Sequence, residues 1–288
     1  MSLRSVAHRL LAQEELNFLL TNRIPRHALT RFMGWFARRE NPLLRVPSIA
    51  LWRFFCDVDL TDAQTREFRS LHHAFTRALV PGARVFDADP AVFAAPCDAI
   101  VGAFGTVHGG QAFQVKGMDY ALADLLGDVE EASAFEGGQF ITLRLTAGMY
   151  HRFHAPQDMV VEQVRYISGD TWNVNPVALK RVERLYCRNE RAPILARLAD
   201  GEARVALVPV AAILVASIRL PFVDAAEPVR SLHQRIWREQ VRFAKGEEMG
   251  WFEHGSTIVA LLPPGLRPVE GLASGARIKA GEAMLVAG

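Results

Sequence analysis

The sequence is poor in cysteine, with only three among 288 residues and no pair in Cys-x-x-Cys spacing. This odd and sparse set, Cys56, Cys97 and Cys187, excludes a disulfide scaffold and indicates reduced thiols in the cytoplasm. No run reaches the roughly 18 to 20 apolar residues that a membrane-spanning helix needs. Polar residues 13–15 interrupt the pattern of a cleaved signal peptide early. We therefore expect neither secretion through a cleaved signal peptide nor insertion into a membrane.

Several short motifs that mark common chemistries are also missing. There is no P-loop, no GxGxxG, no HExxH and no zinc-type pairing of cysteines. Nucleotide hydrolysis, a Rossmann cofactor and a zinc protease therefore have no support. We also expect no metal site. We expect no nucleic-acid partner, because the basic residues cluster in an aromatic-rich end while the rest of the chain is acidic.

The balance of charge conceals two unlike parts. The chain is 50% hydrophobic and 22% charged, with a formal net charge of +2, which describes a globular protein and excludes disorder. Residues 1–53 hold nine Arg, no Lys and three acidic residues, a net of +6, which leaves the remainder at −4. The excess of positive charge therefore lies entirely at one end.

That basic end has the pattern of amphipathic helices. We predict three short helices over residues 5–56, interrupted at Pro25, Pro42 and Pro47. Their apolar residues recur three and four positions apart, which places them on one helical face: Leu16, Leu19, Leu20, Leu29, Phe32, Met33 and Phe36. Arg-rich helices with aromatic residues are typical of segments that lie on an anionic bilayer, although a helical cap over the core would have a similar pattern. We expect residues 1–80 to form a membrane-associating helical segment.

The rest of the chain, residues 81–288, is predicted to be a β-rich core. A fourth helix before it is indicated by Thr61 and Gln64 in capping-box spacing. Short β-rich runs separated by Gly, Pro and Asp follow, at 99–107, 139–145, 159–167, 204–219 and 256–262. Only 118–126 and 228–243 have a helical pattern. Strands in succession with few helices predict an α+β fold with an antiparallel or mixed sheet.

Three positions carry groups suited to chemistry. His151 and His154 lie three apart in Tyr150–Pro156, a spacing that fits structural histidines, acid–base groups or, without an obvious third ligand, a metal site. Asp98 precedes a strand and is either a solvated turn residue or a catalytic carboxylate. Ser256 lies in a Gly-Ser-Thr turn before an apolar strand, which by itself means little.

The order of four segments is more specific than any one of them. Together they resemble the phosphatidylserine decarboxylase family, from about residue 60 to the end. The segments are Val115–Leu122, Tyr150–Pro156, Arg188–Arg191 and Lys245–Thr257.

This resemblance implies a proenzyme that cuts itself between Gly255 and Ser256. The products would be a β chain, 1–255, and an α chain, 256–288, whose first residue becomes a pyruvoyl group. Asp98 and His154 would complete a triad with Ser256, and His151 would serve the substrate reaction. The spacing of the two histidines leaves open which one faces the serine.

The same resemblance implies conversion of phosphatidylserine to phosphatidylethanolamine and carbon dioxide through a Schiff base on the pyruvoyl group. It also implies a peripheral homodimer at the cytoplasmic face of the inner membrane, with a phospholipid substrate. The alternatives are a pyruvoyl-dependent decarboxylase of another amino acid or amino-lipid, and a non-catalytic membrane-binding homologue. Two departures bear on this. His254 stands where the family usually has leucine, and residues 208–218 are bulkier than the expected glycine-richer strands.

Overall fold

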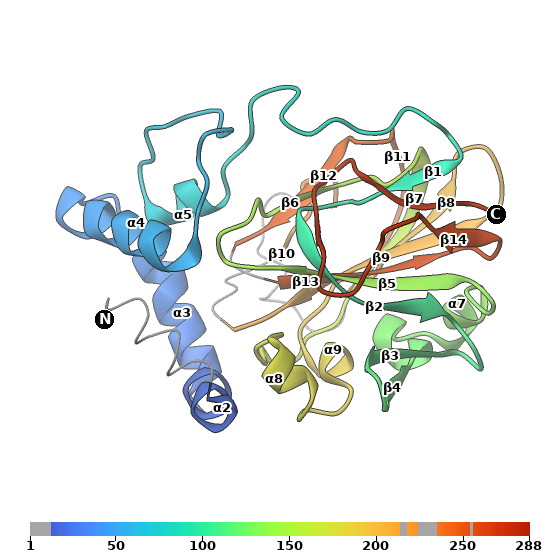
Figure 1. Cartoon of the computed structure of the whole chain (residues 1–288), viewed down its shortest axis with the longest axis horizontal. Helices are drawn as coiled ribbons and strands as arrows, with labels where there is room; N and C mark the ends of the chain where they lie inside the picture. The colour runs from blue at the N-terminus through green and yellow to red at the C-terminus, as the bar shows by residue number, and fades with distance from the viewer. Residues whose placement is uncertain (1–12, 214–217, 224–234, 254–255) are drawn as a thin grey trace.

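A computed structural model describes residues 13–213, 218–223, 235–253 and 256–288. A group of helices lies on one side of a β-rich body, and the C-terminus lies on the opposite side (Figure 1). The first helices are α2 (Glu14–Asn22), α3 (Arg26–Ala37), α4 (Pro42–Cys56) and α5 (Leu71–Phe75). The predicted bilayer-facing helices therefore exist and are spatially separate from most of the sheet.

Two of the three predicted proline interruptions are confirmed. Pro25 is the N-cap of α3 and Pro42 is the first residue of α4, positions where a missing N–H costs nothing. The break at Pro47 is wrong, because α4 continues through it. Proline removes one helical hydrogen bond there, and the Ser48 hydroxyl donates to the nearby Arg45 carbonyl at 2.9 Å.

The predicted helix start at Thr61 is also wrong. The Thr61 backbone N–H and hydroxyl both donate to Asp59 Oδ1, at 2.9 and 2.7 Å, so this hydroxyl is engaged in a local turn. Helix α5 starts later, after Ser70, whose side chain accepts from the His73 backbone N–H at 3.1 Å. Ser70 is therefore the N-cap.

The β-rich body confirms the α+β class. Its largest sheet has eight strands in the order β11-β7-β8-β9-β13-β5-β2-β15, and every strand pair among the described residues is antiparallel. The strands are β1 (Val92–Ala94), β2 (Ala99–Thr106), β3 (Gln111–Val115), β4 (Met118–Ala121), β5 (Gln139–Leu145), β6 (Arg152–His154), β7 (Met159–Tyr166), β8 (Ile194–Leu198), β9 (Arg204–Ala211), β10 (Ile218–Arg219), β11 (Arg235–Phe243), β12 (Glu248–Phe252), β13 (Ser256–Leu262), β14 (Leu266–Pro268), β15 (Arg277–Ile278) and β16 (Ala283–Ala287). Short helices α6 (Leu122–Leu126), α7 (Val129–Ser133), α8 (Pro176–Leu179) and α9 (Leu185–Arg188) join them.

Four of the five predicted strands agree with the structure to within one residue. The predicted 139–145 and 256–262 coincide with β5 and β13, and all seven residues of β13 are buried. The predicted 204–219 is too long, since β9 ends at Ala211 and β10 joins another sheet. Part of that bulky run, 214–217, lies outside the described residues.

Both helices predicted in the core need correction. Residues 118–121 form strand β4, and only 122–126 are helical. Residues 235–243 form strand β11, while 228–234 lie outside the described residues. Strand β11 pairs with β7, which places Trp237 opposite Val164 and buries it. This tertiary pairing outweighs the local helical spacing.

Candidate active site

Ser256 is the first residue of β13, in the middle of the large sheet. It pairs with Leu145 of β5 on one side and with Ala211 of β9 on the other. Its side chain is fully buried, and its hydroxyl has no hydrogen-bond partner among the described residues. A buried hydroxyl without a partner is costly in a structural role, so this atom is a candidate for chemistry. Residues 254 and 255, which include the predicted cleavage site, lie outside the described part of the chain.

The strand next to Ser256 is held by the segment Arg188–Arg191. The Asn189 side-chain Nδ2 donates to the Ala211 carbonyl at 2.9 Å, and the Ala211 backbone N–H donates to the Glu190 backbone carbonyl at 2.8 Å. Asn189 and Glu190 are both buried. This segment therefore fixes the backbone that runs beside Ser256.

Asp98 lies at the same end of the sheet. Because Arg144 pairs with Ile100 while Leu145 pairs with Ser256, the register places Ser256, Leu145 and the residue after Asp98 level across three strands. Adjacent strands are about 4.8 Å apart, so roughly 10 Å separates the two backbones. Only 8% of Asp98 is exposed.

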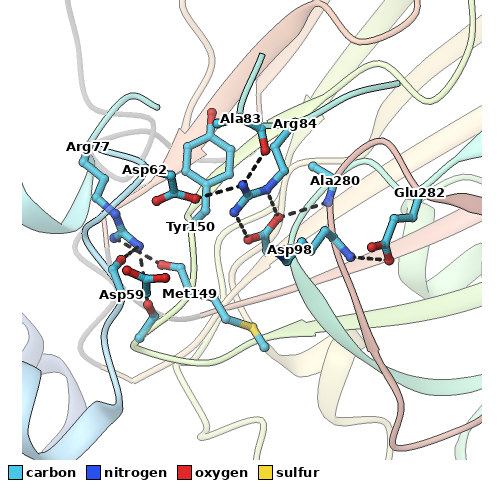
Figure 2. A network of polar contacts seen from close by, with 12 residues as sticks. Asp59, Asp62, Arg77, Ala83, Arg84, Asp98, Met149, Tyr150, Ala280 and Glu282 are labelled. Atoms are coloured by element: carbon cyan, nitrogen blue, oxygen red, sulfur yellow. Dashed lines mark hydrogen bonds and ion pairs between the residues drawn. The ribbon is translucent and has the colours of Figure 1, made fainter. Parts of the chain in front are cut away.

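A bidentate ion pair holds the Asp98 carboxylate. Arg84 Nε donates to Oδ1 at 2.7 Å and Nη2 donates to Oδ2 at 2.5 Å, and the Ala280 N–H also donates to Oδ1. Figure 2 shows the guanidinium between Asp98 and Asp62, with the Tyr150 ring beside it. Burial lowers the pKa of Arg84, but its bonds to Asp98 and Asp62 outweigh this and raise it. Arg84 therefore stays cationic and orients Asp98.

His154 is held as a neutral ring. Its Nδ1 lies 2.9 Å from the Gly246 carbonyl, which can only accept, so Nδ1 carries the proton. Its Nε2 then accepts from the Tyr150 hydroxyl at 3.1 Å. Burial lowers the pKa of His154 from its ordinary value, although the Gly246 hydrogen bond opposes this. A neutral imidazole with a lone pair on Nε2 can act as a base.

The two histidines lie at opposite ends of a short strand pair. The His151 carbonyl accepts from the Phe252 N–H at 3.0 Å, four residues before Ser256, whereas His154 pairs with Glu248. The His154 N–H donates to the Pro96 carbonyl at 2.8 Å, in the loop that leads to Asp98. His151 is fully buried, and the centroid of its ring lies 3.9 Å from the centroid of the Phe75 ring. In strand order, His151 is thus nearer Ser256 and His154 is nearer Asp98.

The four predicted residues thus come from three segments, with His151 and His154 in the same one, and these segments meet at one end of the large sheet. Within the described chain, no hydrogen bond joins Asp98, His154 and Ser256 directly. Arg84 binds the Asp98 carboxylate, the Gly246 carbonyl and the Tyr150 hydroxyl bind the two ring nitrogens of His154, and the Ser256 hydroxyl has no partner among the described residues. The triad therefore stays a prediction.

Comparison with known proteins decides the family. The family model described as phosphatidylserine decarboxylase matches residues 71–286, and a second model, PSD, matches residues 16–51. The chain belongs to the phosphatidylserine decarboxylase family. The resemblance drawn from the four sequence segments is confirmed, and with it the expected enzyme class.

Relatives in this family align along nearly their whole length. The protein from Methylococcus capsulatus is 34% identical over 90% of this chain and 92% of its own. The one from Alcanivorax borkumensis is 35% identical over 88% and 89%, and the one from Bordetella pertussis is 35% identical over 83% of each. All three are named phosphatidylserine decarboxylase proenzyme.

Sequence reasoning missed two residues of this decarboxylase-family site. Arg84 follows an unremarkable Pro-Gly-Ala turn, and nothing local indicates that it binds Asp98. Tyr150 belongs to the same segment as the two histidines, and this proximity in sequence is the only signal that it contacts His154, four residues later.

Proposed function

We propose that the chain is a self-processing phosphatidylserine decarboxylase that cuts itself before Ser256 and uses the resulting pyruvoyl group. Family membership supports the reaction class. The single observation that carries the processing is the buried Ser256 hydroxyl, which has no partner among the described residues and directly follows a glycine. The residues present fit the group, because its atoms would come from a side chain already enclosed by the sheet.

The proposed cleavage consists of an acyl shift followed by an elimination. Ser256 Oγ attacks the Gly255 carbonyl carbon, loses its proton to a base, and displaces the Ser256 nitrogen, so that an ester replaces the amide. Loss of the Cα proton then breaks the Oγ–Cβ bond and leaves Gly255 as a carboxylate. The dehydroalanine that remains takes up water, releases ammonia and becomes the pyruvoyl group. Glycine leaves its own carbonyl accessible to this attack.

We propose that His154 is the base that takes the hydroxyl proton of Ser256 and that His151 reprotonates the product, as the family resemblance implies. The half-buried position of His154, which lowers its pKa, supports a role as a base. In this role its Nε2 exchanges the Tyr150 hydroxyl for Ser256, and Asp98 supplies the negative charge that stabilises the imidazolium. When present, the pyruvoyl group provides an electrophilic carbonyl for the substrate amine and an electron sink as carbon dioxide leaves.

A phospholipid substrate has to be taken from a bilayer, and the N-terminal helices support contact with one. No described helix is long and apolar enough to cross a membrane. Helix α4 lies at the side of the molecule away from the sheets (Figure 1), and none of its residues is buried. Large apolar side chains are exposed along α2 to α4: Leu19, Phe32, Trp35, Leu43, Leu44, Val46, Leu51, Phe54 and Phe55. A cap over the core would bury such residues, so we propose a peripheral membrane surface.

We extend the proposal to the organisation of the protein. Residues 1–80 would form the membrane-associating segment and 81–288 the decarboxylase core. The anionic cytoplasmic face of the inner membrane suits the basic end, where Arg31 and Arg53 are exposed between the apolar residues. A homodimer of processed chains is the proposed assembly.

A denaturing gel with mass spectrometry tests the processing. The wild-type chain should yield fragments 1–255 and 256–288, the smaller with a pyruvoyl amino end, while Ser256→Ala should stay whole. A wild-type chain that remains full length refutes the proposal. Release of carbon dioxide from phosphatidylserine vesicles, but not from free amino acids, tests the substrate. The reverse preference would favour an amino-acid decarboxylase.

A further inference from the structure

A buried carboxylate lies two residues before Gly255. Glu253 is 3% exposed and follows the end of β12. Its Oε2 accepts from Arg38 Nη2 at 2.6 Å, and its Oε1 accepts from Arg219 Nε at 3.0 Å. His72 Nε2 lies 3.2 Å from the same Oε1. One carboxylate thus meets three basic side chains.

Charge, rather than solvent, stabilises this carboxylate. Burial by itself would raise the pKa of Glu253, but the His72 contact and the charges of Arg219 and Arg38 outweigh it and hold the pKa at about 2. Glu253 is therefore ionised at any physiological pH. Removing a partner from such a group would leave a buried charge unpaired, which a protein tolerates poorly.

The three partners come from distant parts of the chain. Arg38 is the C-cap of α3, His72 lies in α5, and Arg219 lies in β10. Arg38 is 215 residues from Glu253 in sequence. The same helix α3 exposes Phe32 and Trp35 on the proposed membrane surface. A single carboxylate therefore ties the N-terminal helices to the strand that leads to Ser256.

The segment between β12 and β13 is anchored on both sides of Glu253. The Phe252 N–H donates to the His151 carbonyl at 3.0 Å, and Ser256 pairs within the large sheet. Only three residues, 253–255, separate Phe252 from Ser256, and these four residue steps span at most about 14 Å. Because Glu253 directly follows Phe252 and lies two residues before Gly255, holding its side chain restricts the backbone that leads to the scissile bond.

We propose that Glu253 is a positioning residue for self-cleavage, and that its ion pair with Arg38 couples the docking of α3 to that reaction. This inference rests on the proposed processing before Ser256. Attack of Oγ on the Gly255 carbonyl requires the two atoms within about 3 to 3.5 Å in aligned geometry, and a displacement of about 1 Å can cost 100-fold in rate. Neither Glu253 nor Arg38 takes part in bond making.

The test follows cleavage of freshly synthesised precursor over time. Glu253→Gln keeps the shape of the side chain but removes its charge, and Arg38→Met removes the partner on α3. Each should slow cleavage by about 10- to 100-fold, and the double variant should be no slower than the slower single variant, because both changes break one link. Arg38→Lys, which keeps a charge, should recover part of the rate.

Arg204→Met is a matched control. Its side chain is 41% exposed and forms an ion pair with Glu162 at 2.9 Å, against 43% and 2.6 Å for Arg38. It starts β9, seven residues from the partner of Ser256, so cleavage should proceed at the wild-type rate. Each variant is also made in the uncleavable Ser256→Ala background, where its thermal unfolding verifies that the precursor is folded. For the chains that do mature, kcat for decarboxylation should stay within about twofold of wild type, since positioning acts before maturation.

Several results would overturn the inference. Wild-type cleavage rates in Glu253→Gln refute the role of the carboxylate. Slow cleavage in Glu253→Gln together with wild-type rates in Arg38→Met refutes the coupling to α3, as does a double variant slowed by the product of the single effects. If Glu253→Gln does not fold, the comparison of Arg38→Met with Arg204→Met decides alone. A wild-type precursor that never cleaves refutes the proposed function instead.

Discussion

Replacing Arg84 by methionine separates the structural from the chemical role of Asp98. The side chains of Arg84 and Asp98 are 12% and 11% exposed, and two hydrogen bonds join them. Removing one member of such a buried pair costs about 3 to 5 kcal/mol, because the other charge is left unpaired. At about 2 °C per kcal/mol for a chain of this length, Arg84→Met should lower the unfolding temperature by roughly 6 to 10 °C. Differential scanning calorimetry in the Ser256→Ala background measures this on uncleaved precursor.

The second arm of this experiment removes both charges. Arg84→Met/Asp98→Asn leaves no charge at position 98 and only the Asp62 carboxylate, whose side chain is 29% exposed, without Arg84, so it should be more stable than Arg84→Met alone. If Asp98 has a role in catalysis, this recovery of stability should not restore cleavage in chains that keep Ser256. A double variant no more stable than Arg84→Met would refute the ion-pair reasoning. Cleavage at the wild-type rate in Asp98→Asn would show that Asp98 serves the fold only.

Three further predictions concern the base and the membrane surface. Because burial lowers the pKa of His154 from 6.5, the neutral base persists below that pH. Cleavage rates should be level at neutral pH and fall only as pH drops through the lowered pKa, and a midpoint above 7 in a pH series would contradict this. Tyr150→Phe removes the hydroxyl that His154 Nε2 must exchange for Ser256, so cleavage in a gel time course should be no slower than in the wild type, with circular dichroism verifying the fold. Leu43→Ser/Phe54→Ser removes two exposed apolar side chains, and burial of each in lipid would contribute about 1.5 to 3 kcal/mol to binding. The affinity for anionic vesicles in a co-sedimentation assay should therefore fall at least 10-fold. Unchanged binding would refute contact through α4.

Local sequence patterns are enough to predict the family, the central strands and the breaks between the N-terminal helices. Ser256–Leu262 could be predicted because five consecutive apolar residues follow the Ser-Thr pair, as a central buried strand requires, and Pro25 and Pro42 because proline acts on its own backbone. Residues 235–243, by contrast, form a strand because their pairing with β7 outweighs local preference, which no local pattern reveals. The fold alone also brings Arg84 to Asp98, and Arg38, His72 and Arg219 to Glu253. Such ion pairs join residues far apart in the chain and leave no local pattern, so their partners become known only when the fold brings the side chains together.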